Sequence, residues 1–469
     1  MPVLTHADLL PSLLLIFFTL AGALLLKRSI GSSRAYARGK AEGTLWLALP
    51  ALCLSLLGVP EVLALGAAGA LWGWWPTAAF VTGLVPMWLL GALMAAPARR
   101  RYGWQAALLL VLLYMAGVAV ALALFARTVA GVHILDAVVR GSGWTLGSIH
   151  PALVMLCAVV SLLTLLWGGV RGTARGRVLQ FIFLLLGLLP LSFAACDAVG
   201  GWGGVARAAQ IASPSGWMAQ PAVLLLAGAL VGLMVGFADL RPHQVLQSCA
   251  SPAPRPLLAV LLGLPLLGLA LLLIVPGAVA PQLPKPQNAV VEQNVEGVIL
   301  RTTTFARSEE EQGQGLVPAV VDLQSGAVQA GSLAYTQGAA KVALKLLHGP
   351  ALGLMMAAFL AFLLGGMAAQ LSAVAALCEQ ELLPLWPPYG AQSEEGRLRL
   401  LRWTSVAAMV PSVALALWLG RHGVQSNLLV SGYLALFCAV QLLLGLLLRL
   451  QGKPTAVRAH KTARGGKRG

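Results

Sequence analysis

Long apolar runs alternate with short polar gaps along almost the whole chain, and each run is long enough to cross a membrane as a helix. A helix satisfies its own backbone hydrogen bonds in lipid and needs roughly 20 apolar residues to cross. The pattern predicts about 11 segments, near 9–27, 45–70, 76–97, 104–126, 148–169, 178–197, 219–239, 256–279, 347–383, 402–420 and 427–450. We therefore expect an all-α polytopic membrane protein.

Basic residues gather in every second gap between these segments. Most of the 32 Lys and Arg lie in these gaps or in the C-terminal tail: Lys27, Arg28, Arg34, Arg38 and Lys40; Arg99 to Arg101; Arg171, Arg175 and Arg177; Arg241 and Arg255; Arg397, Arg399 and Arg402; and seven residues from Arg449 to Arg468. Lys and Arg are retained on the cytoplasmic side during insertion. The pattern predicts an external N-terminus and a cytoplasmic C-terminus in a bacterial inner (plasma) membrane.

Composition supports the membrane assignment, since 58% of the residues are hydrophobic and the mean hydropathy is +0.83. The net charge of +16 is explained by topology and by a tail, 451–469, that can rest on anionic lipid, so no nucleic-acid partner is expected. The six cysteines show no metal-ligand spacing, and we expect neither a resident metal nor a cofactor.

The stretch 280–346 is the one long polar insertion, and the charge pattern places it outside. Two runs, 295–304 and 316–329, carry β-branched residues at alternating positions around Ser325-Gly326. They favour a small β-hairpin, and a solvated loop is an equal alternative.

Two apolar segments contain residues that interrupt helices. The second contains Gly58-Val59-Pro60-Glu61, and the seventh contains Gly228, Gly232 and Gly236. Breaks at matching positions of two repeats indicate a substrate site at the membrane midplane. Glycine is also common in membrane helices because it allows close packing, which is the alternative.

Glu61 is the strongest single candidate for function. A carboxylate inside an apolar helix is costly and marks a functional site by default. It can bind a cationic or hydroxyl-bearing solute or carry a proton; alternatively it stays hydrated near the external surface or caps a helix end. Asp239 ends its segment, and we expect it at the membrane interface.

Several short motifs occur in the order found in the sodium:solute symporter family, and the chain resembles that family over residues 9–450. The motifs are Ser33–Lys40, Leu166–Arg171 followed by Val178–Gln180, Gly200-Gly201-Trp202, Pro242–Ser248 and His348–Leu354. The resemblance implies a lead helix and two inverted five-helix repeats. The expected division is 1–44 (lead helix and basic loop), 45–197 (first repeat), 198–450 (second repeat, with the insertion) and 451–469 (tail).

The substrate candidates follow from the two helix breaks, and the cation candidates follow from the resemblance. Substrate is expected at Ser55, Gly58, Glu61 and Gly232, and a cation at Ser55, Gly365, Gly366 and Ser372. Gly365-Gly366 stands where the family often has two hydroxyl residues, and Arg177 stands where it has an Asp. These departures weaken the case for sodium coupling, so both sodium and a proton are candidates for the coupling ion.

The leading functional hypothesis is a secondary active transporter for a small organic solute, working by alternating access. The alternative is a relative that does not transport and serves as a sensor or as a subunit beside another membrane protein. We do not expect an enzyme, because the apolar segments contain no nucleophile and base at helical spacing.

Overall fold

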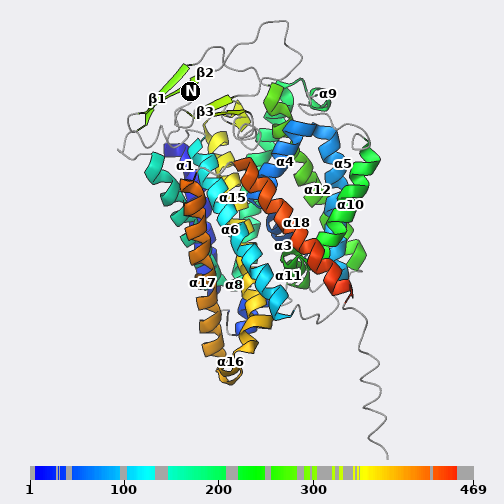
Figure 1. The fold of residues 1–469 in the computed structure, drawn as a ribbon, viewed down its shortest axis with the longest axis vertical. Helices are drawn as coiled ribbons and strands as arrows, with labels where there is room; N and C mark the ends of the chain where they lie inside the picture. The colour runs from blue at the N-terminus through cyan, green and yellow to red at the C-terminus, as the bar shows by residue number, and fades with distance from the viewer. Residues whose placement is uncertain are drawn as a thin grey trace, which may run out of the picture.

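A computed structural model describes residues 6–27, 30, 32–38, 45–95, 103–131, 146–207, 220–248, 255–282, 290–295, 298–303, 319–322, 327–330, 342–343, 346–347, 349–422 and 426–450. Within these residues the protein is a bundle of long helices, most of which run side by side along the long axis of the molecule (Figure 1). The predicted tail at 451–469 lies outside the described residues.

Every one of the predicted apolar segments contains a helix. The principal helices are α1 (His6–Leu26), α3 (Leu45–Leu56), α4 (Val59–Trp72), α5 (Trp74–Ala95), α6 (Trp104–Gly131), α8 (Leu146–Ala198), α10 (Pro221–Ala238), α11 (Leu240–Ser248), α12 (Arg255–Val279), α15 (Pro350–Leu377), α17 (Glu394–Arg421) and α18 (Ser426–Leu450). Shorter helices are α2 (Ser33–Arg38), α9 (Trp202–Ala206) and α16 (Pro387–Ala391). The bundle confirms an almost entirely helical polytopic membrane protein.

Eight helices of the described part are long and apolar enough to cross a membrane, or nine if α3 and α4 form one broken span. Two further apolar helical stretches, Leu9–Leu25 and Gly263–Val279, are shorter. The predicted count of 11 crossings and the inverted repeat therefore stay predictions. α8 contains two of the predicted segments, and Gly169 at φ 54° and ψ −162° separates them.

The insertion contains two antiparallel hairpins. β1 (Val290–Val295) pairs with β2 (Val298–Thr303), and β3 (Ala319–Asp322) pairs with β4 (Ala327–Ala330). β3 and β4 lie within the predicted run 316–329, and the predicted Ser325-Gly326 turn lies outside the described residues. β2 lies within the predicted run 295–304, and its pairing with β1 was not predicted. The strands lie at one end of the bundle and α16 at the other (Figure 1).

The glycines of α10 do not interrupt that helix, which corrects the sequence interpretation. α10 is continuous through Gly228, Gly232 and Gly236, and their α-carbons face the backbone of α5. A Cβ on Gly232 would lie 2.2 Å from the Leu84 carbonyl oxygen. Glycine serves here because two helix backbones approach each other closely.

Candidate functional site

The first helix break lies between α3 and α4, whose axes differ by 71°. Gly58 occupies the break in an extended conformation, and Val59 and Pro60 open α4. Proline is well suited to the first turn of a helix because its missing N–H has no partner there. The Gly58 amide donates to Glu61 Oε2 over 3.1 Å, so Glu61 caps its own helix. A Cβ on Gly58 would lie 2.9 Å from that oxygen, so a larger residue here would displace the Glu61 carboxylate.

The second break lies between α10 and α11, three residues after the last glycine of α10. Asp239 is extended there at φ −70° and ψ 116°, and its Oδ1 accepts a hydrogen bond from the Arg241 amide at 3.1 Å. Tyr114 of α6 donates its hydroxyl proton to the same Oδ1 at 3.1 Å and accepts from the Leu240 amide at 3.0 Å. The freed backbone of this break is thus satisfied by side chains, as a buried break requires.

One guanidinium joins the two breaks. Arg241 donates to both carboxylate oxygens of Asp239 at 3.2–3.3 Å, and its Nη1 donates to Glu61 Oε1 at 3.2 Å. The Arg241 and Asp239 side chains are fully buried, and Glu61 keeps 10% of its side chain exposed. The face of Phe437 lies 4.6 Å from the guanidinium carbon, which adds a cation–π contact. We call Glu61, Asp239 and Arg241 the charged cluster.

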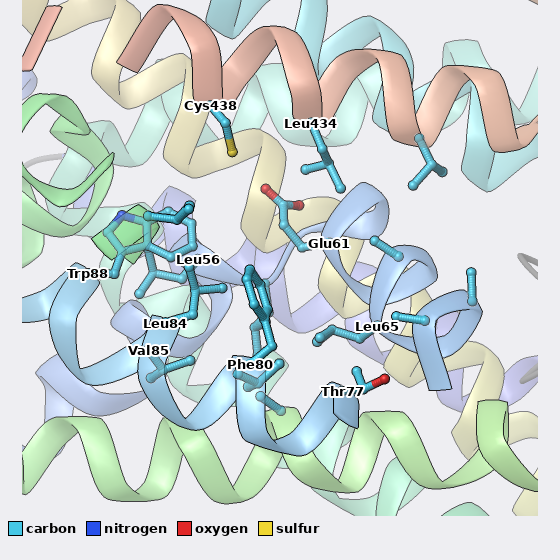
Figure 2. A pocket seen from close by; sticks show the side chains of 18 of the residues that line it. Leu56, Glu61, Leu65, Thr77, Phe80, Leu84, Val85, Trp88, Leu434 and Cys438 are labelled. Atoms are coloured by element: carbon cyan, nitrogen blue, oxygen red, sulfur yellow. The ribbon is translucent and has the colours of Figure 1, made fainter. Parts of the chain in front are cut away.

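A pocket of about 580 Å³ lies beside the charged cluster, between α4, α5, α10, α12 and α18. Glu61 is the charged residue in its wall, and most of the other lining side chains are apolar. Figure 2 shows the carboxylate directed toward α18, which carries Leu434 and Cys438, with Phe80, Leu84 and Trp88 on the α5 side. The pocket can therefore surround an apolar body and offers one carboxylate to it.

The four candidate substrate residues separate in the structure. Glu61 lines the pocket, and Gly58 holds the Glu61 carboxylate in place. The Ser55 hydroxyl donates to the Leu52 carbonyl oxygen of its own helix at 2.9 Å. Gly232 is buried against α5 and is not among the pocket-lining residues.

The candidate cation residues lie where α15 crosses the first break. A Cβ on Gly366 would lie 3.0 Å from the Gly58 α-carbon, and one on Gly365 would lie 2.8 Å from the Leu54 Cβ. The Ser372 hydroxyl donates to the Ala368 carbonyl oxygen at 2.6 Å. The predicted neighbourhood of the two elements is present, and the packing between their backbones is tight. Among the described residues, no group of three or more His, Cys, Asp or Glu could hold a metal ion.

Sequence reasoning missed most of the charged cluster. Asp239 was expected at the membrane interface, and Arg241 was counted among the cytoplasmic loop charges; both are 1% exposed. The available signal was the pair of opposite charges two residues apart at the end of a glycine-rich apolar helix. Tyr114 had no local signal, because its role depends on the approach of α6 to the second break.

No family model matches the sequence, and no curated protein matches it. Among solved structures, a Na⁺-coupled sialic acid symporter in a substrate-bound, outward-open state superposes with a TM-score of 0.64 at 14% identity, over 93% of this chain and 87% of that chain. The chain shares the fold of this sialic acid symporter. This agrees with the resemblance to the sodium:solute symporter family. Together with the long apolar helices of the described part, it supports an integral membrane protein.

Two further solved structures match more distantly. The crystal structure of MhsT in complex with L-phenylalanine gives a TM-score of 0.37 at 15% identity, over 91% of this chain and 87% of that chain. A manganese transporter mutant of Eremococcus coleocola gives a TM-score of 0.33 at 14% identity, over 95% of this chain and 90% of that chain.

Proposed function

We propose that the protein is a secondary active transporter that moves a small organic solute across a bacterial inner membrane by alternating access. The observation that carries the proposal is the ion pair between Glu61 and Arg241, which joins the two helix breaks. Broken helices that meet at one site are the arrangement that inverted-repeat transporters use to bind substrate. The proposed orientation has the N-terminus outside and the C-terminus in the cytoplasm.

The charged cluster also supplies the contact that must change during transport. α4 and α11 belong to different halves of the proposed repeat, and the Glu61–Arg241 pair is a direct link between them. A solute that reaches Glu61 from the pocket competes for this link. Asp239 keeps Arg241 in place through its own hydrogen bonds while the link changes.

Sodium coupling has less support than transport itself. Gly365 and Gly366 offer no side-chain oxygen, which leaves the hydroxyl oxygens of Ser55 and Ser372 as the side-chain ligands among the four candidate residues. A hard cation requires several oxygen ligands. The shortage of side-chain oxygens favours a proton as the coupling ion. It also favours the second candidate function, a sensor or partner subunit that binds solute without moving it.

The test is uptake by the purified full-length protein in proteoliposomes. A panel of small labelled solutes is offered under an imposed sodium gradient, a proton gradient or no gradient. Accumulation of one solute under a gradient, absent from empty liposomes, supports a coupled transporter and names the ion. Binding of a solute without any uptake supports the sensor or subunit.

A further inference from the structure

The charged cluster carries more negative than positive charge. The described ion pairs around the breaks join two carboxylates, Glu61 and Asp239, to the single guanidinium of Arg241. With all three groups ionised the sum is one negative charge. An uncompensated buried charge is expensive, so the cluster favours a ligand that brings a positive charge.

The excess charge is accessible from the pocket at Glu61. Arg241 and Asp239 have no exposed side-chain surface, whereas Glu61 lines the pocket and its side chain is 10% exposed. Asp239 holds Arg241 through three donor–acceptor contacts, and Glu61 holds it through one. Glu61 is therefore the carboxylate that can accept a second donor while Arg241 stays in place.

The wall around Glu61 suits an organic cation better than a bare metal ion. Leu56, Leu57 and Leu65 lie beside the carboxylate in the pocket wall and offer no side-chain oxygen. Phe80 and Trp88 add aromatic surface, which favours a cationic organic group as well as an apolar body.

A second acceptor in the pocket lacks a partner. The side-chain oxygen of Asn427, on α18, is buried and accepts no hydrogen bond among the described residues. An unpaired buried acceptor is costly, and a donor on the ligand reaches this oxygen only after the Asn427 side chain rotates toward the pocket. Glu61 is therefore the wall acceptor that is open to a donor on the ligand, while the hydroxyls of Thr77 and Ser431 donate to the carbonyl oxygens of Gly73 and Asn427.

We infer that the pocket binds a protonated primary amine with an apolar body, whose ammonium group donates to Glu61. The inference rests on the proposed function, because it names the class of solute for the same site. The ammonium shares Glu61 with Arg241 or takes its place, and the apolar body lies against the aromatic and aliphatic wall.

Three probes with one skeleton separate charge from shape: 2-phenylethylamine, the neutral 2-phenylethanol and the anionic 3-phenylpropionate. Their affinities are measured by titration calorimetry on the full-length protein in potassium buffer. We expect the amine to bind roughly tenfold or more tightly than the alcohol, the advantage of a charge-assisted hydrogen bond. Glu61→Gln should remove that advantage, and Asp197→Asn, which changes an exposed carboxylate, should not.

The outcomes separate the ligand class from the transport function. Retention of the alcohol's affinity by Glu61→Gln shows that the variant pocket is intact. Equal affinity for the amine and the alcohol, tighter binding of the carboxylate, or an unchanged amine affinity in Glu61→Gln would overturn the inference. Amine binding without uptake into proteoliposomes contradicts transport and leaves the ligand class standing. Uptake of the carboxylate alone contradicts the ligand class and leaves transport standing.

Discussion

Replacing Arg241 should destabilise the protein more than replacing either of its partners. Arg241→Met keeps most of the side-chain volume and leaves Asp239 and Glu61 facing each other without a cation. Breaking a buried ion pair by removing one partner costs about 3–5 kcal/mol, and the lost cation–π contact adds roughly 1 kcal/mol. The expected loss of unfolding free energy is therefore about 4–6 kcal/mol.

Glu61→Gln should cost far less, because Arg241 keeps Asp239 as its partner. The glutamine oxygen can still accept from the Gly58 amide and from Arg241. The weaker, neutral hydrogen bonds cost about 1 kcal/mol of unfolding free energy, and removal of the excess negative charge of the cluster offsets part of that loss. The triple variant Glu61→Gln, Asp239→Asn and Arg241→Met removes all three charges. It should recover most of the stability lost in Arg241→Met alone.

The assay is denaturant-induced unfolding in mixed detergent micelles, followed by the fluorescence of the 13 tryptophans. The reasoning predicts Arg241→Met as the least stable of the three variants, with at least about 2 kcal/mol between it and Glu61→Gln. An Arg241→Met protein within about 1 kcal/mol of the wild type would refute the buried charged cluster.

Three further results are expected. Gly232→Ala should destabilise the protein by about 1–3 kcal/mol in the same unfolding assay, because its Cβ would lie 2.2 Å from the Leu84 carbonyl oxygen. The matched control Gly268→Ala, with no atom within 4 Å of the added Cβ, should be neutral or slightly stabilising. Tyr114→Phe should lower the free energy of unfolding by about 1–3 kcal/mol, because Asp239 loses a donor and the Leu240 amide loses its acceptor. An unchanged unfolding midpoint would contradict that geometry. Exchange of sodium for potassium should leave the thermal unfolding temperature unchanged, and selective stabilisation by sodium would show that a sodium site exists.

The helical architecture could be predicted from the sequence because lipid imposes a simple rule on each segment separately. An apolar run of sufficient length must form a helix, and every predicted run contains one. The first break could be found in the same way, since Gly58 and Pro60 are local signals and Glu61 is conspicuous in an apolar helix. Local signals misled at the second break, where Gly228, Gly232 and Gly236 mark close packing with α5 and the chain turns at Asp239.

The charged cluster could not be predicted from local patterns because its members lie far apart in the chain. Arg241 and Glu61 are 180 residues apart, and Tyr114 contacts Asp239 from a third helix. A charged residue near the end of an apolar segment is usually at the membrane surface. Only the packing of α6 and α18 against the second break shows that Asp239 and Arg241 are buried inside the bundle.

Access to the pocket from both sides of the membrane tests the central claim most directly, and it requires no knowledge of the solute. Cys438 lines the pocket near Glu61 and is a native probe (Figure 2). In a variant whose other cysteines are replaced by serine, Cys438 is treated with a membrane-impermeant cationic methanethiosulfonate in right-side-out and in inverted vesicles. Alternating access predicts reaction in both preparations, slowed by 2-phenylethylamine. Reaction in only one preparation, whatever the ligand, would contradict transport and favour a protein that binds its solute without moving it.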